Sequence, residues 1–71
     1  MKIKEYLKKK KISQHTFSAK IKVSRYSLHK YIRGQIPARK QAWTIFNETD
    51  GEVTFEDMGF KSIPKNPLKD F

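Results

Sequence analysis

Five side chains between residues 25 and 33 could bind an anion, and they are Arg25, Tyr26, His29, Lys30 and Arg33. On a helix that turns about 100° per residue, Leu28, Tyr31 and Ile32 cluster on one side and face a core. Tyr26, His29, Lys30 and Arg33 then point the other way, and Arg25 lies on the flank in the exposed first turn. Because this outward face contains no acid, we expect it to contact an anion.

The sequence contains few residues in patterns that would support catalysis or metal binding. The chain has no cysteine, no glycine-rich phosphate loop and no carboxylate cluster among its basic residues. His15 and His29 are too far apart, without a third ligand nearby, to predict a metal site. The acids Asp50, Glu52, Glu56 and Asp57 surround a turn and a helix start, where capping explains them, and their spacing does not match a calcium loop. We therefore expect no enzyme, cofactor, metal or small-molecule ligand.

The charge is unevenly distributed along the 71 residues. Residues 1–41 contain 13 Lys and Arg against Glu5, a net +12, whereas residues 42–71 have a net charge of −3. This predicts a polyanion-binding side, although charge alone also fits a solubilising surface, and the run Lys8–Lys11 could simply be solvated. No apolar run approaches the roughly 18 residues of a membrane span, and the absence of cysteine fits a reducing compartment. We expect a cytoplasmic protein.

Apolar spacing and helix breakers predict an all-α fold of four or five short helices. We expect helices over residues 2–10, 13–21, 24–34 and 38–49, with Ser13 and Ser24 as N-caps. A capping box at Thr54–Asp57 predicts one further helical turn through Met58. Residues 1–61 form the expected domain, and residues 62–71 an extended or disordered tail. The expected core side chains are Phe17, Ile21, Leu28, Ile32, Ile45 and Phe46.

The segment Gln14–Gly34 places two helices on either side of a tight turn, so the helices must cross steeply. It resembles the lambda-type Cro/C1 repressor family (XRE-like) of helix-turn-helix proteins at many positions, which are Gln14, Phe17, Ser18, Ile21, Val23, Ser24, Leu28, Tyr31, Ile32, Gly34 and the following Ile36-Pro37. The sequence departs from the family at Lys22, where a left-handed turn residue is usually glycine. It also has Ser18 in place of a more usual alanine, adding a buried hydroxyl that needs a carbonyl partner.

The resemblance implies a role for individual side chains. The residues at the base-contacting positions of the family are Arg25, Tyr26 and Lys30. The residues expected to contact phosphates are Gln14, His15, Ser24, His29, Arg33, Arg39 and Lys40. Arginine and lysine suit guanine, while Tyr26 could touch a thymine methyl, bind a phosphate or only pack on a neighbouring side chain.

The resemblance implies a sequence-specific regulator of transcription that binds double-stranded DNA, with a Cro-like repressor as the leading expectation. We expect a homodimer on DNA whose contact uses the region after residue 43, with apolar candidates Trp43, Val53, Phe55, Met58, Phe60, Leu68 and Phe71. Trp43 could instead pack under the C-terminal segment. The alternative function is a protein-interaction module, such as the antitoxin of a toxin–antitoxin pair. RNA binding is disfavoured, because Tyr26 is the only evident stacking platform.

Overall fold

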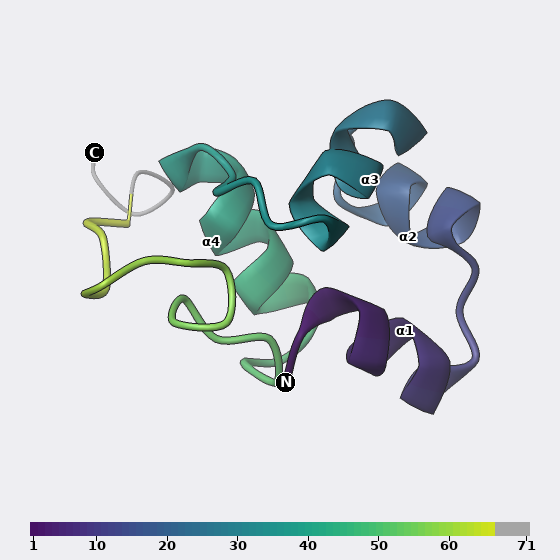
Figure 1. The fold of residues 1–71 in the computed structure, drawn as a ribbon, viewed down its shortest axis with the longest axis horizontal. Coiled ribbons are helices and arrows are strands. Elements are labelled where there is room, and N and C mark those ends of the chain that lie inside the picture. Colours follow the sequence, from purple (N-terminus) through teal and green to yellow (C-terminus); the bar gives the residue numbers. More distant parts are fainter. Residues whose placement is uncertain (67–71) are drawn as a thin grey trace.

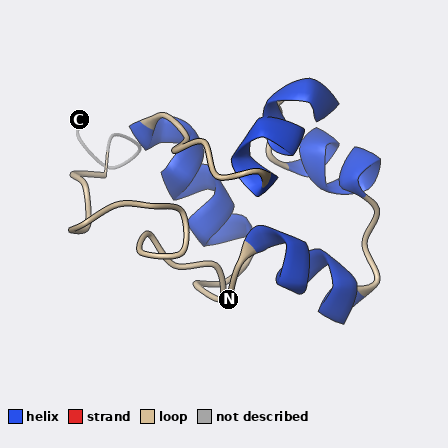
Figure 2. Ribbon diagram, viewed as in Figure 1, coloured by secondary structure: helices blue, strands red, loops and turns tan. Residues whose placement is uncertain are grey.

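The computed structural model describes residues 1–66, which form a bundle of four helices joined by short connections (Figure 1). The helices are α1 (Ile3–Lys10), α2 (Gln14–Lys20), α3 (Arg25–Ile32) and α4 (Arg39–Glu48). Residues 1–66 contain no strand, and the chain between and after the helices consists of turns and loops (Figure 2). The predicted all-α fold class is confirmed. None of the helices in this range is long and apolar enough to cross a membrane.

Two serines begin the second and third helices, as their sequence context predicts. Ser13 Oγ accepts a hydrogen bond from the backbone N–H of Thr16 at 3.1 Å, and Ser24 Oγ accepts one from Ser27 at 3.1 Å. Each contact gives a partner to an amide that the helix itself leaves without one. Both predicted N-caps are therefore confirmed, and they set where α2 and α3 begin.

The core draws side chains from all four helices and from the segment that follows them. Phe17, Leu28 and Ile45 are fully buried, and each contributes about 1.5–3 kcal/mol through burial. Of the other predicted core residues, Ile21 is buried, whereas Ile32 and Phe46 are partly buried and pack against the cluster. The core thus fixes the positions of α2 and α3 relative to α1 and α4.

The segment after α4 contains the predicted single helical turn but no fifth helix, because the Met58 amide donates to the Thr54 carbonyl at 3.2 Å and α4 is the last helix within residues 1–66. Thr54 and Asp57 do form the predicted capping box, with Thr54 N–H donating to Asp57 Oδ2 and Asp57 N–H donating to Thr54 Oγ1, both at 3.1 Å. The chain then continues as hydrogen-bonded turns, in which the Phe60 amide donates to the Phe55 carbonyl at 2.9 Å. Only a few residues separate the capping box from Gly59, whose φ is +101°. This segment is too short to propagate a helix.

The structure corrects the prediction of which apolar side chains could form a dimer contact. Val53, Phe55 and Met58 are buried in the core of the monomer, so they are not available to a second chain. Trp43 is partly buried, its ring centroid lies 4.6 Å from that of Phe55, and its indole N–H donates to the Pro64 carbonyl at 3.0 Å. Trp43 therefore packs against the C-terminal segment, one of the two roles that the sequence left open.

Two of the predicted dimer residues, Leu68 and Phe71, lie outside the described residues. The described part of the predicted tail, residues 62–66, has no regular secondary structure.

The acidic segment after α4 is held against the start of the chain, where the N-terminus lies beside it (Figure 1). The Met1 ammonium donates to the Glu52 carbonyl at 2.6 Å and to Asp57 Oδ2 at 2.7 Å. Burial opposes ionisation of Asp57, but hydrogen bonds from the ammonium and from Thr54 outweigh it and lower the pKa of this carboxyl. The Asp57 carboxylate thus connects this segment to the start of the chain.

The same segment also pairs with the far end of α1. Glu52 contacts Lys9 at 3.1 Å and Lys10 at 3.4 Å, and the hydrogen bond from Lys9 lowers the pKa of the Glu52 carboxyl. Two lysines of the run Lys8–Lys11 thus have a carboxylate partner within the chain.

Candidate nucleic-acid interface

The turn between α2 and α3 depends on a lysine with left-handed backbone geometry. Lys22 has φ 58°, as the resemblance predicted for this position, and its N–H donates to the Ala19 carbonyl at 3.3 Å. The next amide, that of Val23, donates to the Ser18 carbonyl at 3.0 Å. These bonds end α2 within one turn and allow α3 to start at Arg25 in a new direction.

A small side chain lies where the two helices meet. Ser18 is 4% exposed, and its hydroxyl donates to the His15 carbonyl at 2.8 Å. The predicted carbonyl partner for this buried hydroxyl is therefore present. α2 and α3 pack directly on one another, and they lie together at one end of the molecule (Figure 1).

The outward face of α3 is open to solvent. Leu28 is fully buried beneath the helix, which fixes its rotation. Arg25, His29 and Arg33 are exposed, and the side chain of Tyr26 is 70% exposed. The helical projection of the sequence thus describes these four side chains correctly, whereas Lys30, which it also places on the outward face, is partly buried.

Two of the three predicted base-contacting residues touch each other. Lys30 Nζ lies 4.4 Å from the centroid of the Tyr26 ring, one helical turn earlier, and Lys30 is partly buried. Of the roles left open for Tyr26, packing on a neighbouring side chain is present in the structure. Arg25, the third predicted residue, stands exposed at the first position of α3.

The predicted phosphate-contacting residues lie at the starts of three helices and along α3. Gln14 and His15 are exposed at the start of α2, and Arg39 and Lys40 are exposed at the start of α4. The Ser24 hydroxyl is already engaged, because it caps α3 and donates to Ser27 Oγ at 3.2 Å.

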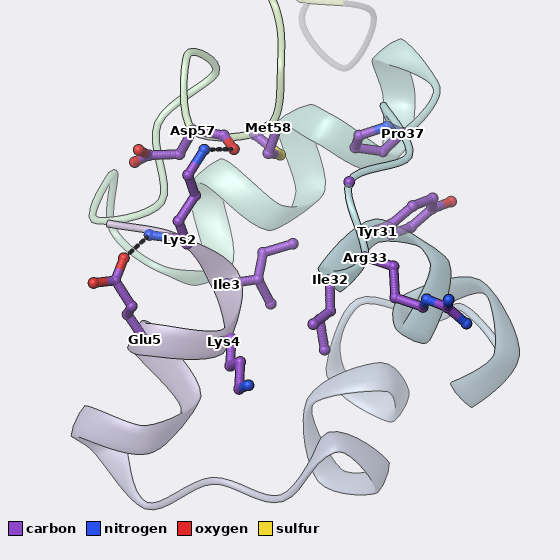
Figure 3. A pocket seen from close by; sticks show the side chains of 11 residues that line it. Lys2, Ile3, Lys4, Glu5, Tyr31, Ile32, Arg33, Pro37, Asp57 and Met58 are labelled. Carbon is purple, nitrogen blue, oxygen red and sulfur yellow. Dashed lines mark hydrogen bonds between the residues drawn. The ribbon is translucent and has the colours of Figure 1, made fainter.

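Arg33 stands at the C-terminal end of α3 beside a cavity of about 360 Å³ between α1 and α3 (Figure 3). Ile3 of α1 and Ile32 of α3 are apolar parts of its lining, and Lys2 and Lys4 lie around it with Arg33. Within residues 1–66 Arg33 forms no salt bridge.

Positive charge is uncompensated along α3 and at the start of α4 within residues 1–66. No Asp or Glu occurs between Glu5 and Glu48 in the sequence. The ion pairs found in residues 1–66 involve the Met1 ammonium, Lys9 and Lys10, and none involves a cation of α3 or α4. Arg25 and Arg39 occupy the first positions of their helices, where the helix dipole disfavours a cation. A bound anion would reduce the repulsion among these unpaired cations and the unfavourable interaction of Arg25 and Arg39 with the helix dipoles.

Two exposed polar side chains that the sequence does not single out adjoin the predicted residues. Thr16 lies in the first turn of α2 beside His15, and Gln35 follows the end of α3. The Thr16 hydroxyl is engaged in the cap of α2, because Ser13 donates to Thr16 Oγ1 at 2.9 Å. Among residues 1–66, no group of three or more His, Asp or Glu side chains is placed to hold a metal ion.

The comparisons with known proteins give one result. A family model described as "Helix-turn-helix" matches residues 3–52, which include all four helices and the turn between α2 and α3. Searches of curated proteins and of solved structures find no match.

Proposed function

Because the chain belongs to the Cro/C1-type helix-turn-helix family of DNA-binding transcription regulators, we propose that it recognises a specific duplex sequence by placing α3 in the major groove. The observation that carries this proposal is the outward face of α3, which is exposed, cationic and without any acidic partner in the described residues. A major groove is wide enough to admit a helix and displays a distinct donor and acceptor pattern for each base pair.

Three side chains would supply sequence preference. Arg25 can donate two hydrogen bonds to O6 and N7 of a guanine, and Lys30 can donate to the same atoms from a more flexible stem. Tyr26, between them on the exposed face, can contact a thymine methyl or hydrogen-bond to a phosphate. All three side chains belong to α3, whose rotation is fixed by the buried Leu28.

A second group of residues would grip the DNA backbone without reading sequence. Exposed cations and polar groups near helix starts favour phosphate, because the local dipole and the free amides already attract an anion. The proposed contacts near helix starts are Gln14, His15, Ser24, Arg39 and Lys40. Two more, from the last turn and the C-cap of α3, where only the side chains favour phosphate, are His29 and Arg33. Since the Ser24 hydroxyl is engaged as a cap, its contact would come through the backbone at the start of α3.

We further propose that two copies bind together and that the consequence is repression. One recognition helix contacts about four or five base pairs and buries roughly 600–1,000 Å², which is too little to select one site in a genome. Two protomers with recognition helices about 34 Å apart would double the contacts and require an inverted repeat. Among the described residues after residue 43, Ile63, which is 73% exposed, and the partly buried Phe46 and Phe60 are apolar side chains that such a contact could use. The proposal places the protein at DNA in the cytoplasm and includes no enzymatic activity.

The test is selection of bound duplexes from a random pool, followed by sedimentation on the selected site. The proposal expects an inverted repeat with half-sites about one helical turn apart, occupied by two protomers. No enrichment of any sequence, together with tight and salt-resistant binding to an acidic protein, would favour the antitoxin-like interaction module instead.

A further inference from the structure

Two exposed-face side chains of α3 make a contact of their own. Lys30 Nζ lies 4.4 Å from the ring centroid of Tyr26, a distance at which an ammonium is attracted to the electron-rich face of an aromatic ring. Tyr26 is 70% exposed, whereas Lys30 is partly buried. The ammonium therefore rests on a ring at the surface of the helix.

Other charges around Lys30 do not offer a competing attraction. None of the ion pairs in residues 1–66 includes Lys30, and the sequence has no acid between Glu5 and Glu48. His29 and Arg33, its exposed neighbours on the same helix, add no negative charge. The Tyr26 ring is thus the attractive partner that the described structure gives to this ammonium.

A lysine held in this way differs from a free one. Its flexible four-carbon stem normally lets the three ammonium donors range widely, and holding them in place on binding costs side-chain entropy. A ring that already restrains the ammonium lowers this cost. It also leaves the remaining donors directed away from the ring.

We propose that Tyr26 is a positioning residue for Lys30, so that the two side chains recognise one guanine-containing base pair as a unit. This inference rests on the proposed function, since it assigns how part of the sequence preference arises. It differs from a direct role of Tyr26, in which the hydroxyl or the ring edge would itself contact a base or a phosphate.

The two roles separate when the hydroxyl and the ring are removed one at a time. Tyr26→Phe keeps an aromatic face beneath the ammonium and removes only the hydroxyl. Tyr26→Leu removes the ring and keeps an apolar side chain with good helix propensity. Lys30→Ala and the double variant Tyr26→Leu/Lys30→Ala complete a cycle that measures the coupling between the two positions.

The experiment measures the affinity of these variants for the selected duplex and for duplexes with each base pair changed in turn. Lys30→Ala should abolish the preference at one base pair. Tyr26→Leu should weaken the preference at that same base pair by about 2- to 5-fold and should have no further effect in the Lys30→Ala background. Tyr26→Phe should keep the preference at that base pair, because the ring remains beneath the ammonium, and an equal loss of affinity for all duplexes would instead report a phosphate contact of the hydroxyl.

A second readout needs no DNA. In NMR spectra of the free protein, the ring should shift the Lys30 Hε resonances upfield in the unsubstituted chain and in Tyr26→Phe, but not in Tyr26→Leu. Because Tyr26 is exposed, Tyr26→Phe and Tyr26→Leu should unfold at nearly the same urea concentration as the unsubstituted chain, which shows that lost preference does not reflect lost folding.

Several results would overturn the inference while leaving the proposed function intact. They are a changed preference at a different base pair in Tyr26→Leu, full additivity in the double variant, a loss in Tyr26→Phe as large as in Tyr26→Leu, or unchanged Lys30 Hε shifts in Tyr26→Leu. A chain that selects no duplex sequence would instead refute the proposed function, and this inference with it.

Discussion

At the scale of single residues, sequence preference should depend on side chains of α3 and not on cations in general. Arg25→Ala should cost about 1–3 kcal/mol on the selected duplex and should abolish the preference at particular base pairs, because it removes a two-donor contact to guanine. Arg39 is a matched control, since it is also an exposed arginine at the first position of a helix.

Arg39→Ala should weaken binding to selected and random duplexes by the same factor, because a phosphate contact carries no sequence information. Titration of both duplexes with each variant provides the measurement. An equal loss on both duplexes for Arg25→Ala would show that Arg25 contacts only the backbone.

The turn residue Lys22 gives a second prediction at this scale. Its φ of 58° strains any residue with a Cβ, so Lys22→Gly should raise the free energy of unfolding by up to about 1 kcal/mol. Lys8→Gly removes the same charge from the helix α1 and should lower it by about 1 kcal/mol. Urea unfolding of both variants is the check, and destabilisation by Lys22→Gly would mean that the lysine side chain stabilises the turn.

At the scale of elements, the sequence predicted the helices well and the segment after them poorly. Ser13 and Ser24 are local signals, and the helices begin directly after them, as expected. Val53, Phe55 and Met58 have no local signal of burial, because they belong to irregular turns and their burial depends on packing against the helices. The sequence pattern therefore predicts these three residues at a dimer surface, whereas in the structure they complete the core of the monomer.

The contact between Asp57, in the segment after α4, and the Met1 ammonium should make the free energy of unfolding depend on pH. The pKa of Asp57 is lower in the folded chain than its ordinary value, so its contribution is present above that ordinary value and is lost as pH falls through the lowered one. Asp57→Asn should therefore lower the free energy of unfolding at pH 7 by less than about 1 kcal/mol, because the pair is partly solvated.

This difference between Asp57→Asn and the unsubstituted chain should shrink as the pH falls below about 4. Glu56→Gln is the matched control, since Glu56 is exposed and precedes Asp57 in the same turn. Urea unfolding at a series of pH values measures both. A difference that stays constant down to pH 2 would mean that the charge of Asp57 does not act through this contact.

At the scale of the whole molecule, the candidate site was predictable where it follows helical geometry. The projection of α3 identified its exposed side chains, because Leu28 sets the inward direction. The contact between Tyr26 and Lys30 was only one of several possibilities, since it depends on side-chain rotamers. The pairing of Lys9 and Lys10 with Glu52 could not be predicted, because it joins residues distant in the sequence.

Assembly on DNA is the property that involves the whole surface. Ile63→Ser should leave the stability of the monomer unchanged, because the side chain is 73% exposed, but should reduce cooperative binding to an inverted repeat. Ser62→Ala, at the adjacent exposed position, should bind like the unsubstituted chain. Deleting residues 62–71 should reduce cooperativity further, and it should also lower the free energy of unfolding because it removes the Pro64 carbonyl that accepts from the Trp43 indole N–H. Sedimentation on the selected duplex gives the number of protomers, and one protomer with full specificity would refute the dimer.

The central proposal is that clustered cations provide affinity and α3 provides choice of sequence. The most direct measurement is the affinity of the intact chain for its selected duplex and for a scrambled one across a range of salt concentrations. If each protomer neutralises about five phosphates, log K against log salt should have a slope of about −4 to −5 per protomer on both duplexes. The selected duplex should bind at least about 10³-fold more tightly throughout. A slope near zero, or equal affinity for the two duplexes, would contradict the proposal.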